Sequence, residues 1–447
     1  MLRLHGTQVV NQQGHLEIGG CDTVELARQF GTPLYVMDEA HIRESCKQYQ
    51  SSFVKGMENA EVVYASKAFL TLAMCQIIHE EGLGLDVVSG GELYTALKAD
   101  FPPAHIYFHG NNKSREELSM AINAKVGRIV VDNFYELSML NDLAKEMNQQ
   151  VNILIRISPG IEAHTHEYIQ TGQNDSKFGF TLSNGSADQA VDLALSYPNL
   201  AVKGLHAHIG SQIFELNSFY HEVQIMIKFM ANIYVRTNCL LQELNLGGGF
   251  GIYYASGDEP AKISDYAKTV QDALEETCQS HTFPRPKIII EPGRSIVGTA
   301  GTTLYSMGSI KEIPGIRKYV AVDGGMADNP RPSLYQARYE AVVANRLNME
   351  AAERVSITGK CCESGDMLIW DVDLPKVNPG DLLAVLSTGA YNYSMSSNYN
   401  RLTRPGVVLV KDSHADLIVK RETYYDLLRN DIVPERFKHG HRVTDNT

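Results

Sequence analysis

The chain has 447 residues, 44% hydrophobic and 21% charged, which is typical of globular proteins and long enough for two domains. A net charge of −12 with scattered lysine and arginine argues against a nucleic-acid-binding protein. There is no signal-peptide pattern, no run of about 18 apolar residues and no CxxC motif among the seven cysteines, so we expect a cytoplasmic, non-membrane protein with reduced thiols.

Between residues 33 and 282, short β-rich runs alternate with amphipathic segments. The predicted strands are 34–37, 61–65, 83–88, 105–108, 128–131, 152–156, 204–208 and 243–246. The helical segments between them include 113–124, 134–148, 217–236 and 262–279. Eight βα units in about 250 residues predict an α/β fold of the (β/α)₈ barrel type. A doubly wound open sheet is the alternative, because counting repeats does not distinguish the two.

A second domain is expected over residues 283–447, where the pattern changes to strands separated by Gly and Pro. The predicted strands are 288–290, 319–322, 354–357, 381–385 and 407–410. This pattern predicts an all-β domain. Residues 1–32 also have the composition of short strands, and we expect them to join this domain.

Several polar residues follow predicted barrel strands, at the strand ends where barrel enzymes hold their active sites. They are Lys67, Asp86, Arg156, His208 and the triplet Gly247–Gly249. Each alone is more often a structural residue, whereas their joint position on one face indicates a site. The glycine amides can approach a phosphate closely, and loops after the last strands often bind phosphate. A lysine beside that phosphate could meet an aldehyde.

The motifs that carry these residues resemble those of the fold-type III pyridoxal-phosphate (PLP) decarboxylases. They are Tyr64–Lys67, Asp86–Leu93, His206–Ser211, Gly247–Gly251 and Glu291–Arg294. Four further segments are similar to the bacterial diaminopimelate decarboxylases, which convert meso-2,6-diaminopimelate to L-lysine and CO₂: Ala163–His166, Asp175–Phe180, Cys362–Asp366 and Gly389–Asn400. The resemblance implies a PLP-binding barrel followed by a C-terminal β-domain, as in alanine racemase and ornithine decarboxylase.

The resemblance also implies roles around the cofactor. Lys67 forms the Schiff base with PLP, which requires an unprotonated amine, and we expect partial burial near a cationic site to lower its pKa. Glu291 keeps the pyridine nitrogen protonated and His208 stacks on the ring, while Asp86 and Arg156 support Lys67. The phosphate-binding set is expected to comprise Ser211, Gly248, Gly249, Pro292, Gly293, Arg294 and Tyr391.

The substrate-binding residues follow from the same resemblance. Arg294 and Arg331 are expected on the distal carboxylate of the substrate, with Tyr335 and Glu363 near its amine, because guanidinium groups match carboxylates and carboxylates match ammonium groups. Tyr391 is expected to contact substrate as well as phosphate.

Cys362 is expected to be the acid that protonates the carbanionic intermediate, since a thiol pKa of roughly 8.5 permits proton transfer near neutrality. The resemblance places Cys362 and Glu363 in the neighbouring subunit's site, so a homodimer with shared active sites is expected. The alternatives are a related decarboxylase acting on D-lysine, D-ornithine or carboxynorspermidine, and a non-catalytic PLP-binding homologue.

Overall fold

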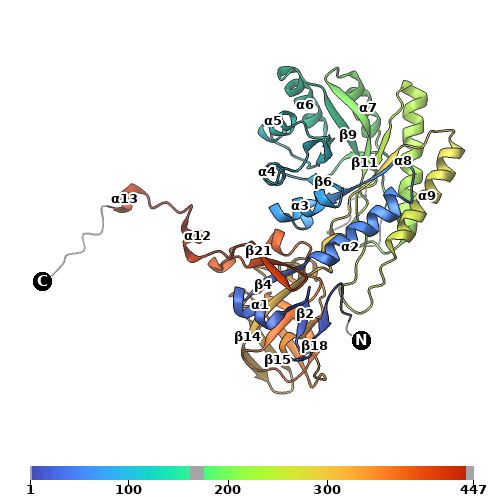
Figure 1. The fold of residues 1–447 in the computed structure, drawn as a ribbon. Coiled ribbons are helices and arrows are strands. Elements are labelled where there is room, and N and C mark those ends of the chain that lie inside the picture. The colour runs from blue at the N-terminus through green and yellow to red at the C-terminus, as the bar shows by residue number, and fades with distance from the viewer. Residues whose placement is uncertain (1–2, 162–175, 439–447) are drawn as a thin grey trace.

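The computed structural model describes residues 3–161 and 176–438. These residues form a closed parallel barrel and a β-rich domain (Figure 1). The barrel strands, in spatial order, are β5 (Ala60–Ala65), β6 (Gly84–Val87), β7 (Ile106–Phe108), β8 (Arg128–Val131), β9 (Val151–Ser158), β11 (Leu200–Ala207), β12 (Glu243–Asn245) and β13 (Lys287–Ile290). The pairing of β13 with β5 and of β8 with β9 closes the sheet, which confirms the barrel and excludes the open sheet.

Helices surround the barrel (Figure 1). They are α2 (Glu39–Tyr49), α3 (Leu72–Glu80), α4 (Gly90–Lys98), α5 (Arg115–Ala124), α6 (Phe134–Glu146), α7 (Ser186–Ser196), α8 (Leu216–Thr237) and α9 (Ile263–Ser280). Several begin where a side chain caps the first turn: Ser89, Ser114 and Asn133 each accept from a backbone amide three residues later. None of the helices in the described ranges is both long and apolar enough to cross a membrane.

The barrel core has two layers, as strand alternation requires. Outward-facing strand residues such as Val62 and Tyr64 pack with the helices in one large apolar cluster. Inward-facing residues form a separate cluster inside the barrel: Val63, Tyr107, Val130, Leu154 and Ile289. Apolar side chains therefore fill the barrel, and chemistry is left to the strand ends.

The β-rich domain contains a sheet in the order β18 (Met367–Leu374), β17 (Glu353–Thr358), β15 (Arg317–Val322), β14 (Gly301–Ile313), β4 (Leu34–Asp38), β20 (Gly406–Lys411) and β21 (His414–Val419). Strand β19 (Leu382–Val385) pairs with β14 and with β16 (Ala341–Val343). The N-terminal residues form β1 (Val9–Val10), β2 (Leu16–Ile18), β3 (Cys21–Asp22) and α1 (Thr23–Phe30). They pack on this domain: Leu16 and Leu26 share a core with Leu304 and Val408.

Two strands lie in a different sheet from the one predicted. The run at 34–37 forms β4, which pairs with β14 and β20 of the β-domain and not with the barrel. The run at 288–290 forms β13, which pairs with β12 and β5 and is the last barrel strand. Both runs are short, apolar and buried, so their composition suits either sheet. The count of eight barrel strands holds, but the barrel begins and ends one strand later than the expected boundaries at 33 and 282.

Four further α-helices are short. Helix α10 (Arg294–Val297) connects β13 to β14, and α11 (Arg331–Tyr335) follows β15. After β21 the chain continues into α12 (Tyr424–Leu428) and α13 (Glu435–Lys438), which extend away from the rest of the molecule (Figure 1).

Candidate active site

A cavity of about 750 Å³ lies at the carboxyl ends of the barrel strands and is walled on one side by loops of the β-domain. Its lining includes these predicted residues: Lys67, Arg156, His208, Ser211, Gly248, Gly249, Glu291, Gly293, Arg294, Arg331, Tyr335 and Tyr391. Asp86 is buried nearby at the end of β6, and Pro292 joins two lining residues. The structure therefore brings most of the predicted set to one cavity.

Lys67 lies in a short 3₁₀ turn, Ser66–Ala68, directly after β5, and its side chain is accessible from the cavity. Burial within the protein lowers its pKa, but the negative charges of Asp86 and Glu291, together with Tyr391, outweigh burial and raise it. The expected lowering of the Lys67 pKa is therefore wrong for this arrangement. Its amine must give up a proton before it can attack a carbonyl carbon.

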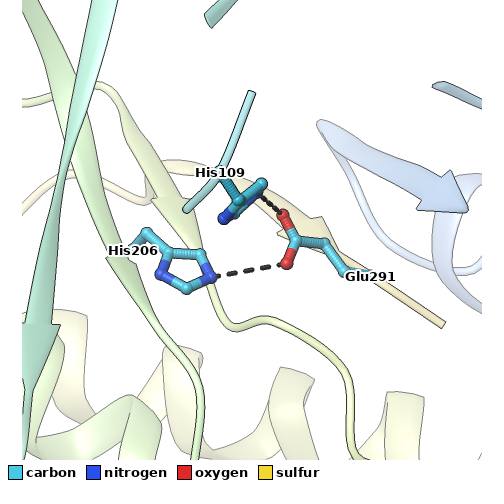
Figure 2. Close-up of side chains that lie close together, drawn as sticks. All are labelled: His109, His206 and Glu291. Carbon is cyan, nitrogen blue, oxygen red and sulfur yellow. Dashed lines mark ion pairs between the residues drawn. The ribbon is translucent and has the colours of Figure 1, made fainter. Parts of the chain in front are cut away.

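Glu291 directly follows β13 and lies against three side chains, of which Figure 2 shows His109 and His206. Asn245 Nδ2 donates a hydrogen bond to Oε1 at 2.6 Å, and His109 Nε2 lies 2.7 Å from the same oxygen. His206 Nε2 lies 3.4 Å from Oε2. Burial alone would raise the pKa of Glu291, but the two histidines lower it well below its usual value. The carboxylate is therefore ionised beneath the cavity.

His109 was not predicted from sequence, and His206 was noted only as part of a motif. His109 follows β7 and His206 lies near the end of β11, so both occupy the strand edge that carries Lys67. The rule that polar residues after barrel strands belong to the site applies to His109 as well, and it is the signal that could have found it.

His208 follows β11, and its Nδ1 accepts a hydrogen bond from the Gly248 amide at 3.3 Å. Burial, with the nearby positive charges of Lys67 and Arg156, lowers the pKa of His208 well below its usual value. The ring is therefore a neutral imidazole, as acceptance of a hydrogen bond at Nδ1 requires. A neutral flat ring suits stacking on an aromatic cofactor.

The glycine turn after β12 needs glycine for steric reasons. A Cβ on Gly248 would lie 2.2 Å from the carbonyl oxygen of Glu291, and Gly249 has φ of +106°. Side chains are excluded at both positions, so the turn presents backbone to the cavity.

Arg294 and Arg331 form a cationic wall on the β-domain side. Arg294 donates to Ser211 Oγ at 2.8 Å and to Tyr254 Oη at 2.6 Å, while its buried Nε has no partner among the described residues. Arg331 donates to Tyr339 Oη at 2.6 Å and stacks on the ring of Tyr254. Within the described ranges, neither guanidinium forms an ion pair with a carboxylate. Two buried cations without a counter-ion favour anionic ligands.

Cys362 and Glu363 do not join this cavity within their own chain. Both are exposed, in the loop between β17 and β18. The Cys362 amide donates to Asn400 Oδ1 at 2.6 Å, and Glu363 Oε1 accepts from the Gly365 amide. The segment Ala163–His166 and Asp175 lie outside the described residues.

A family model described as "Pyridoxal-dependent decarboxylase, pyridoxal binding domain" matches residues 39–298. The chain belongs to the pyridoxal-dependent decarboxylase family. It is 56% identical to the diaminopimelate decarboxylase of Bacillus subtilis over 96% of this chain and 98% of that protein. That of Bacillus methanolicus is 55% identical, with coverages of 94% and 97%. A crystal structure of diaminopimelate decarboxylase from M. jannaschii in complex with L-lysine has a TM-score of 0.90 at 37% identity, covering 96% of this chain and 98% of that one.

Pyridoxal phosphate is the cofactor of this decarboxylase family, and the cavity fits it. The glycine turn suits the phosphate, and Lys67 is available for the aldehyde. The ionised Glu291 suits a protonated pyridine nitrogen. When bound, the cofactor accepts the electron pair left at Cα as a carboxylate departs.

Proposed function

We propose that this protein decarboxylates meso-2,6-diaminopimelate to L-lysine and CO₂, the last step of lysine biosynthesis. The observation that carries the proposal is the pair of buried guanidinium groups, Arg294 and Arg331, in the cavity that contains Lys67. A substrate with a second carboxylate needs a cationic site apart from the glycine turn that suits the phosphate, and guanidinium groups match carboxylates. The relatives named diaminopimelate decarboxylase support the same assignment.

The residues around the cofactor are assigned to different parts of it. Lys67 would hold the cofactor covalently, with Asp86 and Arg156 as support near Lys67, and the Glu291 carboxylate would pair with the pyridine nitrogen. The neutral His208 covers the ring. The phosphate is assigned to Ser211, Gly248, Gly249, the Pro292–Gly293–Arg294 segment and the Tyr391 hydroxyl.

The substrate residues recognise the end of the molecule that does not react. Arg331, with Arg294, binds the distal carboxylate, and Tyr335 lies beside Arg331 on α11. Glu363 takes the distal ammonium. A substrate lacking that carboxylate would leave Arg331 buried without an anion, which is costly.

Cys362 and Glu363 are assigned to the cavity of a partner subunit, and Cys362 to protonation of the product carbon. Their exposure and their absence from the cavity of their own chain support this arrangement. The protein is then a homodimer with shared active sites. We place the protein in the cytoplasm, because a lysine-forming enzyme with seven free cysteines suits that reducing compartment.

The activity is tested with purified protein, PLP and meso-diaminopimelate, followed by release of CO₂ and L-lysine. D-Lysine, D-ornithine and carboxynorspermidine serve as competing substrates. We expect diaminopimelate to have the highest kcat/KM. Faster turnover of any competitor would reassign the substrate, and no turnover of any of them would favour a non-catalytic homologue.

Shared sites are tested by mixing two inactive variants, Lys67→Ala and Cys362→Ala. In a heterodimer one site carries both substitutions and the other carries neither, so random exchange of subunits should restore up to about a quarter of wild-type activity. Activity that stays at the level of the separate variants would place Cys362 in the cavity of its own chain or outside the reaction.

A further inference from the structure

The carboxylate of Glu291 is held mainly through one of its oxygens. Asn245 Nδ2 lies 2.6 Å from Oε1. His109 Nε2 lies 2.7 Å from the same oxygen, whereas His206 Nε2 lies 3.4 Å from Oε2 (Figure 2). All three partners are almost fully buried, with 4% of His109 exposed and 1% of His206. The oxygen Oε2 therefore keeps the longer contact and is the freer of the two to meet a ligand.

His109 also lies between two acids. Its Nε2 is 3.8 Å from Asp86 Oδ1, in addition to the close approach to Glu291. His109 Nε2 thus faces both acids at ion-pair distance and is much nearer to Glu291, although its geometry there is not that of a hydrogen bond. Asp86 and Glu291 would otherwise be two buried carboxylates on one side of the cavity, and like charges disfavour ionisation of both. His109 separates them and favours the ionised form of Glu291.

We propose that His109 is a positioning residue that keeps Glu291 ionised, with Oε2 available to the cofactor, and thereby keeps the cofactor's pyridine nitrogen protonated. The proposal rests on the assigned cofactor role of Glu291 and not on the identity of the amino-acid substrate. A protonated ring nitrogen is what gives the cofactor its capacity to accept electrons. His206, farther from Glu291, has a smaller share in this effect.

The test uses PLP labelled with ¹⁵N at the pyridine nitrogen, bound to wild-type protein and to His109→Leu and His109→Asn. The ¹⁵N resonance reports whether the nitrogen is protonated. In wild type we expect the pyridine nitrogen to be protonated between about pH 6 and pH 9. In His109→Leu we expect the nitrogen to lose its proton at a lower pH than in wild type. His109→Asn retains an N–H donor and should restore the wild-type behaviour at least in part. His105→Leu, on the same segment but largely exposed, is the matched control.

The affinity of the apoprotein for PLP is a second measurement that does not depend on turnover. His109→Leu should bind PLP at least about tenfold more weakly than His105→Leu, equivalent to about 1.4 kcal/mol. Unchanged titration and affinity in His109→Leu would overturn the proposal. So would a stoichiometric metal ion in the isolated protein, because His109, His206 and Glu291 lie close enough together to bind one. A folded wild type that takes up no PLP would overturn the proposed function as well.

Residues 423–438 form a segment that we call the C-terminal arm. Helices α12 and α13 project away from the molecule (Figure 1). The arm exposes six large apolar side chains: Tyr424, Tyr425, Leu428, Ile432, Val433 and Phe437, each with 56–88% of its surface accessible. Apolar residues gathered in this way on a projecting segment indicate a contact with another molecule.

The base of the arm is continuous with the Cys362 surface. Arg401 forms an ion pair with Asp431 of the arm, and Glu422 accepts hydrogen bonds from Asn398 and from the Arg404 amide. The loop that provides Asn398 and Arg401 also provides Asn400, which accepts from the Cys362 amide. The arm thus begins beside the residues that the proposed function assigns to a partner's cavity.

We infer that the arm packs against the second copy of the chain in the homodimer. This inference rests on the proposed shared sites, since the arm and Cys362 would then face the same partner. A triple variant, Leu428→Ser, Ile432→Ser and Phe437→Ser, should weaken dimerisation at least about tenfold in sedimentation equilibrium. Val235→Ser, which replaces an 85% exposed residue on α8, is the control and should leave dimerisation unchanged.

A photo-crosslinker at position 437 identifies what the arm contacts. In a mixture of tagged and untagged chains, crosslinks between the two chain types support the inference, and crosslinks confined to one chain contradict it. Equal dissociation constants for the triple variant and wild type would also contradict it. A wild type that is monomeric yet decarboxylates diaminopimelate would overturn the arm contact and the shared sites while leaving the proposed reaction intact.

Discussion

The guanidinium of Arg331 donates to the hydroxyl of Tyr339 at 2.6 Å, and in the described ranges no carboxylate neutralises it. Burial lowers the pKa of Arg331, but the electron-rich oxygens of Tyr254 and Tyr339 outweigh burial and raise it, so the group remains a cation. Tyr339 in turn donates to Asn392 Oδ1, which fixes its hydroxyl as an acceptor for Arg331. The guanidinium is therefore held in place before any substrate arrives.

Replacing Arg331 should weaken substrate binding more than it slows chemistry. A hydrogen bond to a charged group contributes about 1.5–3 kcal/mol, so Arg331→Gln should raise KM for diaminopimelate by about 10- to 150-fold. Steady-state kinetics would measure this, with Arg317→Gln as the control because Arg317 lies on the surface beside Trp370. An unchanged KM would remove Arg331 from the substrate site.

A side chain at Gly248 should damage cofactor binding. The Cβ of Gly248→Ala would lie 2.2 Å from the Glu291 carbonyl oxygen, so the turn must shift away from the strand that carries Glu291. We expect the apoprotein to bind PLP at least about tenfold more weakly, measured by absorbance titration. Gly308→Ala, where the nearest atom is 3.6 Å away, should bind PLP as wild type does. Wild-type affinity in Gly248→Ala would place the phosphate elsewhere.

The sequence predicts the barrel because short β-rich runs that alternate with helices specify its βα units. It does not specify which β-rich run forms the first barrel strand. Leu34–Asp38 and Lys287–Ile290 are both short buried strands, and only their pairing partners distinguish them. Those partners are far apart in the chain: β13 pairs with β5, and β4 with β14 and β20. Pairing over such distances depends on packing of the whole domain, which local periodicity does not record.

Sequence reasoning placed Lys67, His208 and Glu291 in the cavity because each carries chemistry of its own. The site was predicted least well where the chemistry depends on neighbours. His109 acquires its role only because β7 and β13 bring it to 2.7 Å from Glu291. The direction of the Lys67 pKa shift also depends on how near Asp86 and Glu291 lie, and this information is absent from the motif.

Removing the charge of Asp86 should speed uptake of PLP by the apoprotein. Asp86 is the largest contribution that raises the Lys67 pKa, and only the unprotonated amine reacts with an aldehyde. With Asp86→Asn the Lys67 pKa falls, so the rise of the uptake rate with pH should move to lower pH. Stopped-flow absorbance at a series of pH values would show this, with the exposed Asp416→Asn as the control. A pH profile that does not move would mean that Asp86 and Lys67 are not coupled.

Glu222 on α8 should destabilise the protein at neutral pH. Both of its carboxylate oxygens are buried and lack a partner among the described residues, and burial raises its pKa well above the usual value. Above a pH of about 4.5 the unfolded chain ionises this group while the folded chain resists ionisation, so stability falls as pH rises from that value toward the folded-state pKa.

Glu222→Gln should therefore stabilise the protein more at pH 8 than at pH 4.5. Each pH unit between about 4.5 and the folded-state pKa costs about 1.4 kcal/mol of stability, and each kcal/mol corresponds to about 2–4 °C in Tm for a domain of the barrel's size. Thermal unfolding of the apoprotein at both pH values measures the difference, with the exposed Glu275→Gln as the control. The Gln amide does not titrate, so a gain that is equal at the two pH values would mean that the Glu222 pKa is the same in the folded and the unfolded chain.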